Sequence, residues 1–307
     1  MNSRRSYATA PAPLSSIFSP KLPLSGRRVE EIGARGGGFT LRGGVETYAE
    51  YSPGNVDESI VYVNDSRMDF ITSLKAIEIS RRLLELRGRI TLKHKVNVPI
   101  GMGFGASASI AFTALLTLFK IGGRGISVRE ACRIVHGIEV ECKTGLNSEA
   151  GFLAEGLILV VGEGAPPRVR VDSIPIPHDS MIISVAIAPL EASKILSDPN
   201  ELRKVEEIGD KKLEEILENP TPENFLKKSR EFALEAGLAT KRVQEIFEEL
   251  EKLQVIGYAQ NMIGEACHAL VLRKDARRVE ERLRNAFPEY LVKAFEVGSL
   301  IRSSIQA

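Results

Sequence analysis

The chain has 307 residues, of which 43% are hydrophobic and 26% are charged. This composition is that of a globular protein with room for two cores, and it excludes an intrinsically disordered chain. Lys and Arg number 41 against 40 Asp and Glu, and the net charge of +1 lacks the basic excess of a nucleic-acid-binding protein. No apolar run approaches the ~20 residues that a membrane span needs, so neither nucleic acid nor membrane is an expected partner.

The cysteines indicate the compartment. Cys132, Cys142 and Cys267 are odd in number and form no Cys-x-x-Cys pair, so neither a disulfide scaffold nor a zinc site is expected. We predict small buried thiols in a reducing, cytoplasmic environment. Residues 1–12 lack the apolar segment of a secretory signal, and we expect a short disordered lead there.

The first half of the chain alternates between strand and helix patterns. Residues 39–51 are rich in β-formers and contain Gly43-Gly44, which predicts a glycine-hinged hairpin. Ser127, followed three residues later by Glu130, forms a capping-box pattern that predicts a helix running to about residue 143. Hydrophobic periodicity predicts further helices over 68–87 and 106–120 and strands over 90–98 and 157–161.

The second half begins after a cluster of prolines. We predict a boundary near Pro177, which divides the chain into domains over 1–177 and 178–307. Thr221-Pro222 is a typical start of a helix. Periodicity predicts strands over 182–188, 269–272 and 291–297 and helices over 201–217, 222–234, 241–252 and 276–286. Mixed elements of this kind predict an α+β protein in two halves.

A glycine-rich loop follows a predicted strand and opens a predicted helix. Glycines let backbone amides approach phosphate oxygens, and a helix N-terminus adds free N–H donors. No Gly-Lys-Ser/Thr follows, which excludes a Walker loop, and the spacing differs from the dinucleotide fingerprint. A tight turn without a ligand is the alternative to the phosphate-binding loop that we predict. The nucleotide-binding candidates are Pro99, Gly101, Gly103, Phe104, Gly105, Ala106 and Ser107.

His136 and Glu139 are three residues apart on the predicted helix after Ser127, so their side chains share one face. Position alone indicates a surface ion pair worth less than ~1 kcal/mol. Arg35 lies in a glycine-rich segment, where its guanidinium could clamp a carboxylate or form a structural ion pair. Both readings of Arg35 stay open from the sequence.

The loop motif Pro-x-x-x-Gly-Phe-Gly-x-Ser resembles the nucleotide loop of the GHMP kinases. Four further segments resemble motifs of that superfamily in the same order, and the likeness is greatest to the archaeal pantoate kinases. These segments are 34–38, 135–146, 195–199 and 257–266. The resemblance implies an N-terminal domain that carries the loop and a ferredoxin-like C-terminal domain. It also implies ATP-dependent phosphorylation of pantoate to 4-phosphopantoate in archaeal coenzyme A biosynthesis.

The resemblance assigns roles to individual residues. Ser107 and Glu139 match the residues that hold Mg²⁺ on ATP, and a hard cation prefers such oxygen ligands. His136 matches a residue that faces the acceptor acid, and we expect Arg35 or Ser15 beside it. We further expect a homodimer, because homodimers are common among enzymes of this kind.

Three positions depart from the family pattern on the acceptor side. Ser148 stands where the family has a catalytic Asp, and Glu149 follows one residue late. Pro13 replaces an expected His, and Ala34 replaces an expected Ser. Ser148 and Glu149 are the catalytic candidates; Glu149 either serves as the base or is a solvated loop carboxylate. The alternatives are therefore a kinase for another small hydroxy acid or alcohol, and a nucleotide-binding paralogue without catalysis.

Overall fold

Two long antiparallel strands organise the larger of two sheets in the computed structural model, which describes residues 3–22, 28–190 and 198–306. Strands β1 (Arg4–Lys21) and β2 (Gly33–Pro53) pair along almost their whole lengths. The sheet order is β12-β1-β2-β5-β3-β4, and β6 and β7 extend it from β2. The other strands are β3 (Glu58–Val63), β4 (Ser66–Arg67), β5 (Gly88–Val96), β6 (Leu157–Gly162), β7 (Arg170–Ile174) and β12 (Arg302–Gln306).

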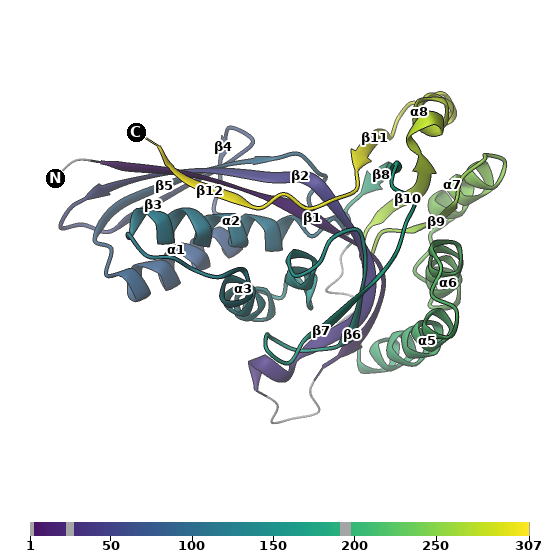
Figure 1. Ribbon diagram of the computed structural model, residues 1–307, viewed down its shortest axis with the longest axis horizontal. Coiled ribbons are helices and arrows are strands. Elements are labelled where there is room, and N and C mark those ends of the chain that lie inside the picture. Colours follow the sequence, from purple (N-terminus) through teal and green to yellow (C-terminus); the bar gives the residue numbers. More distant parts are fainter. Residues whose placement is uncertain (1–2, 23–27, 191–197, 307) are drawn as a thin grey trace.

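Three helices cover one face of this sheet (Figure 1). They are α1 (Ile71–Leu84), α2 (Ala106–Ile121) and α3 (Val128–Cys142), with short 3-10 turns η1 (Val29–Glu31) and η2 (Ser148–Phe152). Helix α2 is buried on nearly every side because it lies between the sheet and its neighbours α1 and α3. Its N-terminus is thereby held at a fixed point beside β1.

The second unit is a four-stranded antiparallel sheet in the order β11-β8-β10-β9. In chain order its elements alternate as strand, helices, two strands, helix and strand, and this is the ferredoxin-like topology that the resemblance implied. The elements are β8 (Ser180–Ala188), α5 (Pro199–Glu218), α6 (Pro222–Glu235), α7 (Lys241–Glu251), β9 (Gly257–Gln260), β10 (Glu265–Leu272), α8 (Arg273–Ala286) and β11 (Leu291–Glu296).

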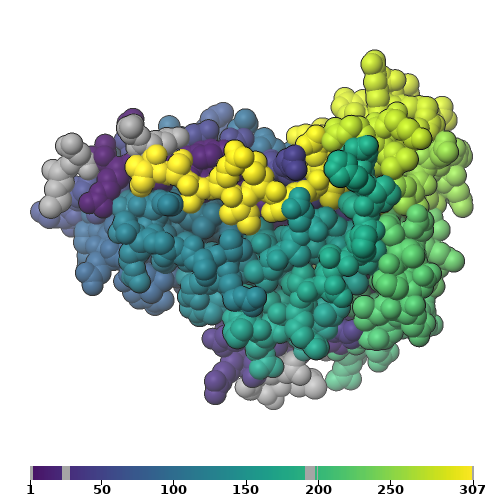
Figure 2. Space-filling view, in the orientation of Figure 1, coloured from purple at the N-terminus to yellow at the C-terminus, as the bar shows by residue number. Residues whose placement is uncertain are grey.

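The chain end returns to the first sheet, where β12 pairs antiparallel with β1. The space-filling view shows this C-terminal segment, in yellow, running along the N-terminal unit (Figure 2). Strand β8 begins at Ser180, shortly after Pro177. The division at residue 177 stays a prediction. Strand β12 falls in the predicted C-terminal domain but pairs with β1 in the N-terminal sheet.

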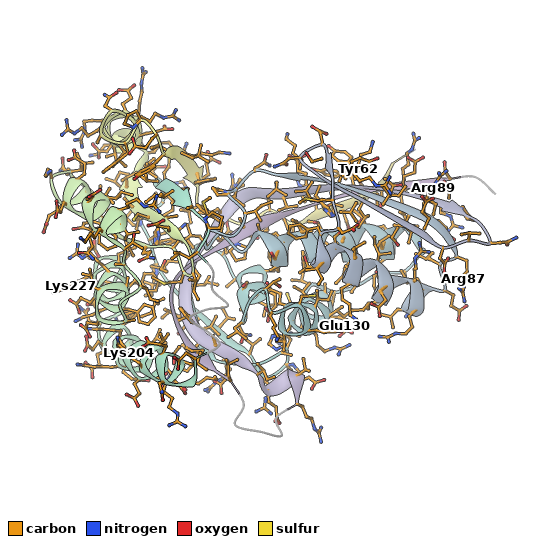
Figure 3. The ribbon with its side chains drawn as sticks, turned by 180° about the vertical axis from the view of Figure 1, so that it is seen from behind. Tyr62, Arg87, Arg89, Glu130, Lys204 and Lys227 are labelled. Carbon is orange, nitrogen blue, oxygen red and sulfur yellow. The ribbon has the colours of Figure 1, made fainter. Side chains whose placement is uncertain are left out.

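Most predicted elements are present, and their local signals act as expected. The Ser127 side chain accepts from the Glu130 amide at 3.1 Å and caps α3, and Thr221 caps α6 in the same way. Lys204 of α5 and Lys227 of α6 are exposed and project outward (Figure 3), whereas Lys212 of α5 is buried and pairs with Glu231 of α6 at 2.9 Å. No helix in the described ranges has the length and apolarity to cross a bilayer.

Two N-terminal predictions are wrong. Residues 4–12 are not a disordered lead, because they belong to β1, where the small buried side chains of Ala8, Ala10 and Ala12 face the core. Residues 39–51 do not form a hairpin but the middle of the single strand β2. Gly44 serves close packing instead of a turn, since a Cβ there would lie 2.4 Å from the Ala12 nitrogen. The pairing with β1 shifts register at this point.

Gly209 lets α5 approach β1 closely. A Cβ at Gly209 would lie 2.5 Å from the Phe18 carbonyl oxygen, whereas a Cβ at Gly137 of α3 would meet nothing within 4 Å. We expect Gly209→Ala to lower the free energy of unfolding by about 1–3 kcal/mol through overpacking. Gly137→Ala should raise it by up to about 1 kcal/mol, because alanine has the higher helix propensity. Urea denaturation of both variants measures the difference; equal stabilisation by both would contradict the close contact.

Candidate active site

The glycine-rich loop lies between β5 and α2 and has left-handed backbone at alternate residues. Gly101, Gly103 and Gly105 have φ values of 75°, 76° and 62°, and Gly105 caps α2. The loop is also closely packed, since a Cβ at Gly105 would lie 2.5 Å from Pro13 and one at Gly103 2.7 Å from Asn261. Glycine is therefore required here by conformation and by space.

The other loop residues frame the start of α2. Pro99 precedes the turn, the Phe104 side chain is buried, and Ala106 and Ser107 form the first turn of the helix. The first amides of a helix have no partner within the helix, so they are free to donate to an anion. The predicted nucleotide-binding residues thus form one continuous loop at a helix N-terminus.

Strand β1 and the C-terminal unit fix this loop. The Ser15 amide donates to the Gly103 carbonyl at 3.0 Å, and the Met262 amide donates to the Ser15 carbonyl at 2.8 Å. The Asn261 side-chain amide donates to the Met102 carbonyl at 3.2 Å. Elements from three distant parts of the sequence therefore meet at the loop.

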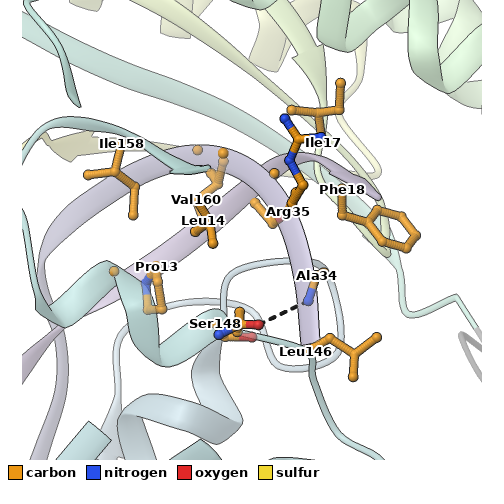
Figure 4. Close-up of a pocket in the computed structure, with 16 residues that line it drawn as sticks. Pro13, Leu14, Ile17, Phe18, Ala34, Arg35, Leu146, Ser148, Ile158 and Val160 are labelled. Atoms are coloured by element: carbon orange, nitrogen blue, oxygen red, sulfur yellow. Dashed lines mark hydrogen bonds between the residues drawn. The ribbon is translucent and has the colours of Figure 1, made fainter. Parts of the chain in front are cut away.

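A pocket adjoins the loop, because Pro13 and Ser15 of β1 contact the loop and also line the pocket (Figure 4). Of the predicted acceptor-side residues, Ser15, Arg35 and Ser148 line this pocket. So do Pro13 and Ala34, two of the positions that depart from the family pattern. The lining residues are Pro13, Leu14, Ser15, Ile17, Phe18, Ala34, Arg35, Gly36, Gly37, Gly38, Leu146, Asn147, Ser148, Gly151, Ile158 and Val160.

The guanidinium of Arg35 reaches α5. Its Nη2 lies 2.8 Å from Glu214 Oε1 and its Nη1 3.4 Å from Asp210 Oδ1. In Figure 4 the guanidinium points away from Ser148. The structure thus favours the structural ion pair over the carboxylate clamp, the two readings that the sequence left open.

Glu149 is completely buried, so it is neither a solvated loop carboxylate nor a side chain that reaches the pocket. Its Oε1 accepts from Asn147 Nδ2 at 3.1 Å and lies 2.9 Å from His136 Nδ1. The other ring nitrogen of His136 lies 3.2 Å from the Val29 carbonyl. His136 is only 1% exposed and does not line the pocket either. Both ring nitrogens face oxygen acceptors, which favours the imidazolium form.

Glu139 is buried and interacts with Glu149. Burial and the charge of Glu149 raise its pKa well above the usual value of 4.5, and an interaction with the Ser148 hydroxyl opposes this shift. One carboxyl oxygen, Oε2, has no hydrogen-bond partner. Glu139 Oε1 and Ser148 Oγ both lie against Gly145, at 2.5 and 2.8 Å from the position of a Cβ there. Glu139 therefore lies close to the pocket residue Ser148.

The two predicted magnesium ligands come from neighbouring helices. Ser107 is half-buried in the first turn of α2, and its carbonyl accepts from Thr72 Oγ1 at 3.3 Å. Glu139 lies on α3, which packs against α2. No hydrogen bond joins the two side chains in the described part of the chain.

Asn147 is a structural residue of the site that the sequence reasoning missed. It has a φ of 64°, and its Oδ1 accepts from the Ala34 amide at 2.9 Å (Figure 4) and from the Gly164 amide at 3.2 Å. Its Nδ2 donates to Glu149 and to the Gly164 carbonyl. A signal existed: Asn147 stands where the family turn has glycine, and Asn tolerates left-handed backbone.

The His136–Glu149 pair leads to a pH prediction. Burial lowers the pKa of His136, but the hydrogen bond and charge of Glu149 outweigh burial and raise the pKa above 6.5. Its contribution to stability is therefore complete below pH 6.5 and is lost as the pH rises through the raised pKa. In Glu149→Gln we expect the pKa to fall below 6.5, because burial then dominates. NMR titration of the imidazole measures both values.

His94 is the internal control for that titration. It is buried without a carboxylate partner, and burial lowers its pKa to about 3, so it should stay neutral in both proteins. An unchanged pKa of His136 in Glu149→Gln would show that the pair is not ionic.

The comparisons with known proteins agree with this geometry. Residues 72–153, from α1 to η2, match the model of the GHMP kinases N terminal domain. A pantoate kinase from Thermococcus kodakarensis is 27% identical over 90% of this chain and 91% of its own length. One from Methanocaldococcus jannaschii is 28% identical over 76% of this chain and 82% of its own.

A solved structure extends the likeness to the whole fold. A phosphotransferase related to the CoA biosynthesis pathway superposes with a TM-score of 0.83 and 24% sequence identity. The superposition covers 99% of both chains, so the two units and the β12 return lie within the shared fold.

Proposed function

Since this chain belongs to the GHMP kinases, we propose that it transfers the γ-phosphoryl group of ATP to a hydroxyl of pantoate and so forms 4-phosphopantoate. The observation that carries the proposal is the junction of the glycine loop with the pocket through Pro13 and Ser15. A kinase needs its phosphate site and its acceptor site to touch, because phosphoryl transfer is in line. The likeness to two pantoate kinases supports pantoate as the acceptor.

The reaction needs positioning more than covalent chemistry. The acceptor hydroxyl oxygen bonds to the γ-phosphorus, the bond from that phosphorus to the β,γ-bridging oxygen breaks, and ADP leaves. The amides of Gly101 to Gly105 and the N-terminus of α2 would hold the phosphates. Ser148 lines the pocket and would hydrogen-bond the acceptor hydroxyl, whose proton would leave to water or to the transferred phosphate.

The buried carboxyl groups fit a magnesium ion. Glu139 Oε2 and Glu149 Oε2 are both buried without a hydrogen-bond partner, and a cation would satisfy such oxygens. The described residues hold no group of three or more His, Cys, Asp or Glu side chains that could bind a metal. Mg²⁺ is usually held by one or two carboxylates together with substrate phosphates and water, so this donor set suits it. Glu139 and Ser107 would hold Mg²⁺, which would neutralise charge on the phosphates.

The lining of the pocket favours an alternative acceptor in place of pantoate. Pro13, Ala34 and Ser148 all line the pocket, and each replaces a polar residue of the family pattern with a smaller, less polar or uncharged one. The pocket wall therefore offers fewer hydrogen bonds than pantoate would receive in the family arrangement. Another small hydroxy acid or alcohol is the alternative substrate.

An ATP-consumption assay with Mg²⁺ tests the proposal, with pantoate offered beside mevalonate, homoserine and glycerate. We expect phosphorylation of pantoate. Turnover of another acceptor alone would select the second candidate. ATP binding, measured by calorimetry, without turnover of any acceptor would contradict catalysis and favour a nucleotide-binding paralogue.

Substitution of Glu139 tests the magnesium site. Burial disfavours the charged form of Glu139, and Gln has the same size as a neutral Glu side chain. We therefore expect the Glu139→Gln variant to fold. Turnover should fall on the order of 10²-fold, and ATP affinity should lose its dependence on Mg²⁺. Calorimetry with and without Mg²⁺ measures the second effect independently of activity.

Glu141→Gln is the matched control on the same helix. Glu141 is exposed and pairs with Lys75 at 2.8 Å, so its loss should leave turnover and Mg²⁺ dependence unchanged. If Glu139→Gln keeps the magnesium dependence of ATP binding, Glu139 is not a ligand.

The remaining predictions of partner and compartment extend this proposal. The pantoate kinase relatives support a small-molecule substrate. The free thiols of Cys132 and Cys267 are buried, which suits a reducing cytoplasm. The homodimer stays a prediction, as does the division of the chain at residue 177.

A further inference from the structure

A buried histidine outside the pocket connects β1 to the phosphate loop. His268 of β10 is fully buried, and its Nε2 lies 3.0 Å from Ser16 Oγ. Its Nδ1 lies 2.8 Å from Oδ1 of Asn261, which is also fully buried. Asn261 in turn donates from Nδ2 to the Met102 carbonyl. Three consecutive hydrogen bonds thus lead from the residue beside Ser15 to the loop.

Only one arrangement of hydrogens satisfies this chain. The Met102 carbonyl can only accept, so the Asn261 amide nitrogen faces it and the Asn261 oxygen faces His268. His268 Nδ1 must therefore carry a hydrogen. Burial lowers the pKa of His268 to about 3, so the ring is neutral and Nε2 accepts from the Ser16 hydroxyl. A rigid ring with a donor on one side and an acceptor on the other meets this requirement.

The backbone around the chain leaves no room for adjustment. A Cβ at Gly264 would lie 2.4 Å from the Met102 carbonyl carbon, and a Cβ at Gly103 would lie 2.7 Å from the Asn261 Cβ. The ring of His268 packs edge-on against Phe39 at 5.7 Å between centroids. A shift of the Asn261 side chain would therefore displace Met102 and Gly103, which it contacts.

We propose that His268 is a positioning residue for the nucleotide. Through Asn261 it holds Met102 and Gly103 in the conformation that binds phosphate, and through Ser16 it fixes the loop relative to β1, whose neighbouring residue Ser15 lines the pocket. The inference rests on the proposed function in taking the loop as the ATP site. It does not depend on the identity of the acceptor.

His94 provides a matched control. Like His268 it is buried, has a pKa lowered to about 3 by burial, and is bonded through both nitrogens, here to Thr47 and Ser73. Its partners lie in the core between β2, β5 and α1 and not at the loop. Replacing either histidine with Phe therefore removes two buried hydrogen bonds. Only the bonds of His268 lead to the glycine loop.

The experiment compares His268→Phe with His94→Phe by calorimetry with MgATP and no acceptor, and by thermal unfolding. We expect both variants to lose thermal stability. Only His268→Phe should weaken ATP binding, by about tenfold, which is the value of one well-placed hydrogen bond. In steady-state kinetics KM for ATP should rise with it, while KM for the acceptor changes less. Equal ATP affinities in the two variants would overturn the proposal.

Asn261→Asp is the second variant and covers the case in which His268→Phe does not fold. It keeps size and the bond from His268 but turns a carboxylate oxygen toward the Met102 carbonyl. ATP binding should again weaken about tenfold, and unchanged binding would overturn the proposal. Normal ATP binding by the unsubstituted protein without pantoate turnover would count against the proposed function and leave this inference standing.

Discussion

The seating of the glycine loop between Pro13 and Asn261 is the constraint on which the rest of the site depends. Left-handed glycines at Gly103 and Gly105 allow backbone to approach both residues more closely than any side chain would permit. The loop amides can then point at an anion while the loop itself is held from two sides. Because Pro13 also lines the pocket, the glycine loop and the pocket are positioned by the same contact.

Behind the pocket lies a buried group of two carboxyls and one histidine. His136 satisfies one oxygen of Glu149, and Glu139 interacts with Ser148, which lines the pocket. Such a group is costly unless something compensates its charge, and the imidazolium compensates only part. A cation bound to the unpartnered oxygens of Glu139 and Glu149, or a proton retained on one of them, would compensate the remaining negative charge. The position of the family's acceptor-side aspartate thus holds the Ser148 hydroxyl, and the buried Glu139 carboxyl lies close to it.

The ferredoxin-like unit helps to hold the glycine loop. The turn after β9 supplies Asn261, Met262 and Gly264, all of which contact the loop or the strand that holds it. Strand β10 supplies His268, which orients Asn261. The glycine loop is therefore held jointly by the two units, although the family model that the chain matches ends at residue 153.

The sequence by itself determined what depends on neighbouring residues. The helix starts at Ser127 and Thr221 and the glycine loop before α2 follow from local propensity and capping. Periodicity also predicts β8, β10 and β11 but not β9 (Gly257–Gln260), so the ferredoxin-like order came from the resemblance and not from local pattern. Only the tertiary structure decided that Glu149 is buried, that Arg35 pairs with α5 and that His268 reaches the loop. Those facts depend on contacts between residues more than a hundred positions apart, or on the burial that such contacts create. Local pattern carries no information about them, because the free energy of a buried charge or hydrogen bond is set by whatever folds against it.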